Sequence, residues 1–277
     1  MSVGTPSPQQ VTAPIRFRRR VGALTPGQLV TLRQAFATSM GVSDDTGYGY
    51  WAGIHGLPLP ISCGNAHGTP YFLPWHRAYL YLFERSLRDR VADASLTWWD
   101  WRTSALGLNP KIPTAFATAR VGGSPNPLAH APVSPLALQQ GSAAGLTMPA
   151  TTARAPHGPG APPLPTTAEV AAVIRVSSFL DFTSQLEDLH NRVHGWVGGH
   201  MGVIPFAAYD PIFWAHHTMI DRIWRLWQLA HPNANPPDAL LDHALPPFPM
   251  TVRQTLDVTA LGYDYASATA ATSAQPI

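Results

Sequence analysis

The chain has 277 residues and a formal net charge of +2, with 45% hydrophobic and only 12% charged residues. Such a composition allows one large buried core, and the charge is too small to predict a nucleic-acid partner. No stretch approaches the ~20 consecutive apolar residues of a membrane span, so we expect no membrane partner. One cysteine, Cys63, excludes an internal disulfide. We therefore expect a single domain over residues 1–277.

The N-terminal segment contains the one basic cluster, formed by Arg16, Arg18, Arg19 and Arg20. We interpret this cluster as a solvated arm, because it is too short for a nucleic-acid site. The first residues, MSVGTPSPQQ, include no apolar run that would serve as a signal peptide. We expect a protein that is cytoplasmic as synthesised, unless a partner protein carries it out of the cell.

Helical patterns dominate the first half of the chain. Thr25 and Pro26 provide an N-cap and a first helical position, and apolar residues then repeat at helical spacing over 26–40. A short helix is expected over 48–55, followed by a loop rich in glycine and proline over 56–70. Pro74 opens a stronger amphipathic helix that we expect to run to about residue 92.

The second half begins with a segment rich in Ala, Pro, Ser, Thr and Gly, over 103–168. We predict a surface loop insertion with at most short helices, which makes His130 and His157 ordinary surface residues. Helical patterns resume at about 168, with long helices over 177–196 and 211–230. These elements predict a mainly α fold, a four-helix bundle around a core metal site with long irregular loops.

Histidines at helical spacing are the candidate metal ligands. His190 and His194 lie four positions apart, so one helix face presents both imidazoles, although two surface histidines would give the same pattern. His216 and His217 begin the next helix, and adjacent helical residues point ~100° apart, so at most one of them faces a given ion. Asp221, one turn after His217, would orient its imidazole and weakly favours His217.

Three further histidines, His55, His67 and His76, lie beside aromatic residues in the N-terminal half. A buried imidazole without a partner is costly and a metal would satisfy it, although hydrogen bonds to the backbone would do so equally well. A ligand set made only of imidazoles, with no paired thiolates, suits copper, while imidazole also binds zinc, iron and nickel.

Four motifs resemble the type-3 copper family of tyrosinases, catechol oxidases and hemocyanins, above all the small bacterial tyrosinases. The motifs are HGTPYFLPWHRAYLYLFE, TWWDW, HNRVHGWVGGHMGVIP and DPIFWAHHTMIDRIWRLWQ. GYDYA at 262–266 is similar to the tyrosine motif that closes the family's catalytic core. The resemblance covers about 15–266 and leaves 267–277 as a flexible tail.

The resemblance implies two copper ions per chain. One copper would be held by His55, His67 and His76, and the other by His190, His194 and His217, with His216 packed behind them. The implied activity is oxidation of phenols by O2, either hydroxylating monophenols and oxidising catechols to quinones, or performing the second step alone. An oxygen carrier of the hemocyanin kind uses the same copper pair, but we expect an enzyme because no covering domain follows.

The resemblance also assigns roles around the coppers. Asn191, with Glu187 as the nearby carboxylate, would position a water that deprotonates the phenol. Fewer residues separate Glu187 from His190 than in several bacterial relatives, so Glu187 is the less direct match of the two. Ile204 would lie at the mouth of the site, or else be an ordinary core residue, and we place Gly195 in the same substrate pocket. Some relatives depend on a separate protein for copper delivery.

Cys63 lies four residues before His67. In fungal and plant relatives a cysteine in this region is joined to the matching histidine through a thioether. The alternative is a free buried thiol that packs as a small apolar residue.

Overall fold

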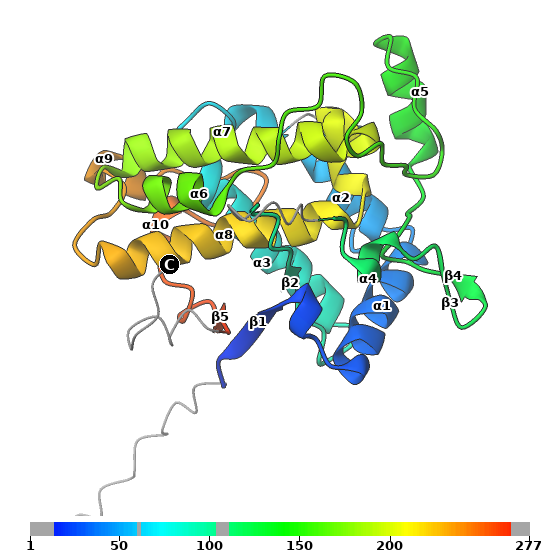
Figure 1. The fold of residues 1–277 in the computed structure, drawn as a ribbon, viewed down its shortest axis with the longest axis horizontal. Helices are drawn as coiled ribbons and strands as arrows, with labels where there is room; N and C mark the ends of the chain where they lie inside the picture. The colour runs from blue at the N-terminus through cyan, green and yellow to red at the C-terminus, as the bar shows by residue number, and fades with distance from the viewer. Residues whose placement is uncertain (1–13, 60–61, 104–110, 267–277) are drawn as a thin grey trace, which may run out of the picture.

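A computed structural model describes residues 14–59, 62–103 and 111–266, and four of its helices form the framework of the metal site. These are α2 (Tyr48–His55), α3 (Phe72–Arg88), α7 (Phe179–Val197) and α8 (Ile212–Ala230). Helices α3, α7 and α8 contact one another, and α7 and α8 run along the long axis of the molecule (Figure 1). The predicted mainly α fold is confirmed.

The helix boundaries follow local sequence signals. In α1 (Pro26–Met40) the side chain of Thr25 accepts a hydrogen bond from the backbone of Gln28, whose own side chain accepts one from Thr25. The predicted bounds of α1 and α2 are confirmed. Helix α3 instead begins at Phe72, two residues before Pro74, because proline is tolerated in a first turn that needs no intrahelical N–H. It ends at Arg88 rather than near 92.

A small parallel sheet was not predicted. Strand β1 (Arg16–Arg20) lies between β2 (Thr97–Trp98) and β5 (Tyr263–Tyr265). The prediction of a solvated arginine arm was wrong for Arg18, which is fully buried at the middle of β1 while its neighbours in the strand are exposed. A strand was missed because its single inward residue is charged, which conceals the alternation of apolar and polar positions.

The segment over 103–168 contains the short helices that the prediction allowed, but parts of it also reach the core. It contains α4 (Thr114–Ala117), the hairpin of β3 (Arg120–Val121) and β4 (Ser124–Pro125), and α5 (Pro135–Ala143), which projects from one end of the molecule (Figure 1). Phe116 and Leu128 are buried in the core, so the description as surface was wrong for them. Arg154 is also mostly buried and pairs with Asp210, two residues before α8, through bonds of 2.8 and 3.0 Å.

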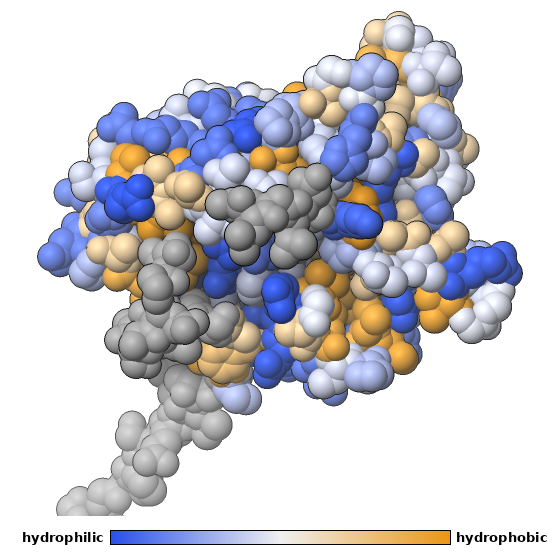
Figure 2. Space-filling view, viewed as in Figure 1, coloured by the Kyte–Doolittle hydropathy of each residue, from blue (hydrophilic) through white to orange (hydrophobic). Residues whose placement is uncertain are grey.

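The remaining elements are short. They are η1 (Val21–Ala23), η2 (Ser62–Asn65), α6 (Thr167–Ile174), η3 (Gly199–Gly202), η4 (Ile204–Tyr209), α9 (Asp238–Leu241) and α10 (Val252–Thr255). Within the described ranges, none of the helices combines the length and apolar character needed to cross a membrane. On the face shown in Figure 2, hydrophobic side chains occur in small groups separated by hydrophilic ones. The predicted tail over 267–277 lies outside the described residues.

Candidate metal centre

Six histidines from distant parts of the chain converge between the helices. His55 is the last residue of α2, His67 follows η2, His76 lies in the first turns of α3, and α7 and α8 supply the others, His190, His194 and His217. Their rings form two facing trios, with His76 stacked on His217 at 4.5 Å between centroids and His67 at 5.4 Å from His190. All six predicted ligand positions therefore lie at one centre.

The trio from α7 and α8 has the geometry of a metal site. The Nε2 atoms of His190, His194 and His217 are 2.9, 3.2 and 3.3 Å apart. Three atoms with these separations all lie about 1.8 Å from one point, close to the ~2.0–2.1 Å at which an imidazole nitrogen binds a metal ion. The residues present thus fit a metal with three imidazole ligands.

The trio from the N-terminal half is looser. Ring centroids are 5.9 Å apart for His55 and His67, 5.8 Å for His55 and His76, and 5.1 Å for His67 and His76. The Nε2 atoms of all three are buried and have no hydrogen-bond partner in the described chain. Buried polar nitrogens are normally satisfied, so three such nitrogens without a partner at one place fit a metal-binding role.

The opposite ring nitrogen is held by the protein in four of the six histidines. His76 Nδ1 lies 2.8 Å from the carbonyl oxygen of Phe72, and His194 Nδ1 lies 2.8 Å from that of Met201. His67 Nδ1 lies 2.9 Å from Glu187 Oε1, and His190 Nδ1 lies 3.1 Å from Asn191 Oδ1. A proton held on Nδ1 by these acceptors leaves the Nε2 lone pair free for a metal.

Burial keeps the cluster in its ligating form. It lowers the pKa of His55, His76, His190 and His217 well below the usual value, and neighbouring histidines lower these pKa values further. The pKa of His194 falls to about 4, again mainly through burial. These five imidazoles are therefore neutral at pH 7, as a metal ligand must be.

His216 takes a different position from His217. Its ring stacks on that of His190, with centroids 5.1 Å apart and planes inclined by 18°. It is fully buried, and its ligating nitrogen lies within 4.8 Å of those of the three α7 and α8 ligands. The residues alone left open whether His216 or His217 is the ligand. This geometry is consistent with His217 as the ligand, and His216 packs behind His190.

Glu187 and Asn191 approach the centre from α7. Both carboxylate oxygens of Glu187 accept the backbone N–H of Gly68, at 2.9 and 3.0 Å, and one also meets His67. The carboxylate therefore fixes the loop that carries His67, a contact that spacing within α7 did not predict. Asn191 is exposed and lies against His190.

Cys63 lies next to two members of the N-terminal trio, His55 and His67. It is fully buried, and its thiol donates a hydrogen bond of 2.7 Å to the carbonyl oxygen of His55. Its sulfur is within 4.8 Å of a ring nitrogen of His67. Burial raises the pKa of this thiol to about 12, so it is protonated at neutral pH.

Ile204 and Gly195 occupy different surroundings. The side chain of Ile204 is 57% exposed, which rules out an ordinary core residue, and its backbone lies against His55. The next residue, Pro205, approaches Gly56 so closely that a Cβ there would stand 2.2 Å from the Pro205 carbonyl oxygen. Gly195 instead faces Pro162, which a Cβ would approach to 3.0 Å.

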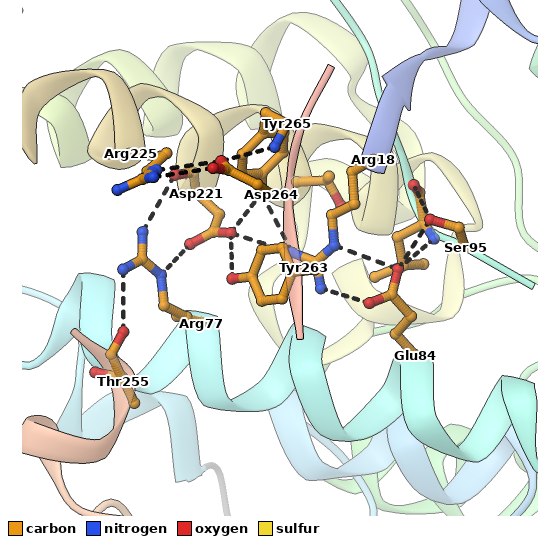
Figure 3. A network of polar contacts seen from close by, with 12 residues as sticks. Arg18, Arg77, Glu84, Ser95, Asp221, Arg225, Thr255, Tyr263, Asp264 and Tyr265 are labelled. Atoms are coloured by element: carbon orange, nitrogen blue, oxygen red, sulfur yellow. Dashed lines mark hydrogen bonds and ion pairs between the residues drawn. The ribbon is translucent and has the colours of Figure 1, made fainter. Parts of the chain in front are cut away.

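The role predicted for Asp221 was wrong. Within the described chain, no hydrogen bond joins its carboxylate to His217, and the Nδ1 of His217 has no partner. Asp221 instead binds Arg18, Arg77 and the hydroxyl groups of Tyr263 and Tyr265 (Figure 3). Burial would raise the pKa of Asp221, but Arg77 and Arg18 together hold it below the usual value.

A family comparison agrees with this arrangement. Residues 45–230 match the model described as the common central domain of tyrosinase. The chain belongs to the tyrosinase family. As a tyrosinase-family protein with two facing histidine trios, it has a type-3 centre for two copper ions.

Two curated relatives illustrate the breadth of the tyrosinase family. The chain is 35% identical to a tyrosinase of Streptomyces lincolnensis over 214 residues, which cover 66% of the chain and 74% of the relative. It is 32% identical over 234 residues to a G-type hemocyanin of Enteroctopus dofleini. That match covers 79% of this chain but only 8% of the hemocyanin, so the chain spans a small part of such a relative.

A solved structure shares the fold of this tyrosinase-family chain. A copper-bound mutant of active Aspergillus oryzae tyrosinase superposes with a TM-score of 0.74, covering 94% of both chains at 21% sequence identity. At that identity the likeness establishes the helical fold around the centre.

His200 is a buried residue whose role the sequence did not indicate. Its Nδ1 accepts a hydrogen bond of 3.0 Å from the backbone N–H of Ala153, and its Nε2 donates to the carbonyl oxygen of Pro149 at 3.1 Å. Both nitrogens are thus occupied by the insertion. This histidine fastens the insertion beside Met201, whose carbonyl oxygen lies next to the His194 ring.

Proposed function

We propose that the protein is an O2-dependent phenol oxidase that hydroxylates monophenols and oxidises catechols, and by extension o-aminophenols, to quinones. His55, His67 and His76 would hold one copper, and His190, His194 and His217 the other. The bound coppers would supply O2 binding and the electron transfer. The Nε2 separations of the second trio and the orphaned Nε2 atoms of the first support this assignment.

Access to the centre is the observation that favours an enzyme. The side chain of His67 is 20% exposed, so solvent reaches part of one ring of the N-terminal trio, although the Nε2 of that ring is buried. Ile204, the first residue of η4, offers an exposed apolar surface next to His55, the last residue of α2. A phenol ring needs an apolar surface beside a solvent-accessible ligand, whereas an oxygen carrier needs only a path for O2.

Asn191 and Glu187 would manage the proton of a monophenol. Asn191 Oδ1 contacts the Nδ1 of one ligand, and Glu187 contacts the Nδ1 of a ligand in the opposite trio. Together they would place a water that accepts the phenolic proton before the ring is attacked. A catechol oxidase without hydroxylation is the second candidate, since the same contacts would also serve ligand orientation alone.

A pair of variants in α7 tests the proposal. Asn191→Ala should lower kcat/KM for a monophenol by at least about tenfold and change kcat/KM for a catechol by less than about threefold, because only the monophenol needs this deprotonation. Asp188→Ala, which alters an exposed neighbour on the same helix, is the matched control. Equal losses on both substrates would assign Asn191 to structure, and a wild-type protein that binds O2 but forms no quinone would favour the carrier.

A further inference from the structure

Arg222 is a buried cation that the copper centre does not use. It follows Asp221 in α8 and lies over the ring of Trp98 in β2, with the guanidinium carbon 4.2 Å from the ring centroid. The residue is only 8% exposed, and its Nε and Nη1 are buried without a hydrogen-bond partner in the described chain. A strong donor group is therefore enclosed with no acceptor.

The surroundings of Arg222 add donors and positive charge. The indole Nε1 of Trp98, in the ring that the guanidinium covers, is also buried without an acceptor. Burial lowers the pKa of Arg222, and the nearby positive charge of Arg102 lowers it further, to about 10. Asp100 and Tyr265 act in the opposite direction. The unpaired donors of Arg222 and Trp98 thus lie close together in the interior, with Arg102 nearby.

Asp100 is the nearest carboxylate, and it is already engaged. Both of its oxygens accept hydrogen bonds from Arg102, at 2.7 and 2.9 Å. This bidentate pair neutralises Arg102 and leaves the charge of Arg222 without a partner of its own. A buried charge is costly unless it is paired and hydrogen-bonded, and contact with an aromatic face satisfies no N–H.

We propose that Arg222 and the Trp98 indole N–H form a binding site for a small monovalent inorganic anion such as chloride. One such ion would accept the unpaired N–H groups of both residues and neutralise the guanidinium. Because Arg222 is only 8% exposed, the ligand of this proposal is a compact ion rather than an organic acid. The site is separate from the coppers, because five residues along α8 place Arg222 about 140° around the helix from His217.

Bromide replaces chloride and gives an anomalous diffraction signal, which makes a direct test. A bromide-soaked crystal of the copper-loaded protein should show a peak touching both Arg222 and Trp98 Nε1, and a crystal of Arg222→Met should lack it. A peak only at the coppers, or only water beside Arg222, would overturn the proposal. Methionine keeps an unbranched stem over the indole while removing the charge.

Thermal unfolding provides the solution test, with chloride exchanged for gluconate at constant ionic strength. The wild-type Tm should rise with chloride and saturate, and Arg222→Met should lose this response. Trp98→Phe keeps an aromatic ring and removes the indole N–H, so it should raise the half-saturating chloride concentration at least tenfold. This variant tests the proposal independently if Arg222→Met does not fold. Arg175→Gln, at an exposed arginine, should respond like the wild type. The same response in all variants would indicate an adventitious ion only.

Discussion

Single side chains decide how the copper centre is built. Four of its six imidazoles are oriented by acceptors on the far side of the ring, and those acceptors come from unrelated parts of the chain. Phe72 and Met201 act through backbone carbonyl oxygens, whereas Glu187 and Asn191 act through side chains. The ligand types could be predicted from the sequence, but the acceptors could not. Every residue has a backbone carbonyl oxygen, so the residue type does not indicate which carbonyl accepts the hydrogen bond.

Loss of one ligand should remove one copper. His76→Ala and His194→Ala each leave two imidazoles where three are needed, so copper content should fall from two ions per chain to one or fewer, with loss of oxidase activity. Metal analysis of the purified variants measures this. His130→Ala, at an exposed histidine outside the centre, is the control. Full copper loading in both ligand variants would contradict the assignment.

Cys63 should keep its thiol. The group donates to the His55 carbonyl oxygen and has a pKa of about 12, so little reactive thiolate is present at neutral pH. Intact mass and thiol titration of the copper-loaded protein after unfolding should find the unmodified mass and one thiol. A mass lower by two hydrogens, with no titratable thiol, would instead establish the thioether with His67.

Among the elements, the helices were predictable and the sheet was not. The end of α1 at Met40 and the course of α7 and α8 follow from caps and 3.6-residue periodicity, which are local signals. Strand β1 instead pairs with residues 78 and 247 positions away, counted from Arg19 to Thr97 and from Arg16 to Tyr263. Pairing at such separation leaves no local pattern.

The same limit explains the error on Asp221. Its position one turn after His217 suggested contact with that ring, but two arginines and two tyrosines from other elements compete for the carboxylate. Helical spacing predicts which residues share a face. It does not predict which distant partners a buried charge selects.

Strand β1 should contribute to stability mainly through Arg18. Arg18 binds Glu84 of α3 at 2.9 Å and Asp221 of α8 at 3.1 Å. Arg18→Met therefore removes one cationic partner from each of two buried carboxylates, which keep Arg88 and Arg77. Removing one member of a buried ion pair typically costs about 3–5 kcal/mol. Denaturant unfolding should show a loss of this order. Arg20→Met, at an exposed position of the same strand, should change stability by less than about 1 kcal/mol; equal effects would disprove the role of the buried pair.

For the whole molecule, the neutral histidine cluster couples stability to pH. The folded-state pKa values of the buried histidines lie below 6.5, so the unfolded chain binds more protons than the folded chain at acidic pH. The stability of the copper-free protein is therefore fully present above about pH 6.5. It is lost as the pH falls toward the folded-state values.

Denaturant unfolding of the copper-free protein between pH 7 and pH 4 measures this coupling. For His194 alone, the change from 6.5 to about 4 corresponds to at most about 3 kcal/mol. His194→Gln should flatten the pH dependence by part of this amount, since one titrating group is removed. A stability that does not change between pH 7 and pH 4 would show that the histidines are not buried in the neutral form.

The parallel pairing of β1 with β5 has a consequence for synthesis. Arg18 and Tyr263, whose contact helps close the buried network, are 245 positions apart in the chain. At ~5–20 residues per second, a ribosome adds that length in roughly 12 to 50 s. Strand β1 is therefore synthesised before every helix that supplies a histidine to the centre, and β5 only after them. The pairing of β1 with β5 is for this reason one of the final events in the folding of the described residues.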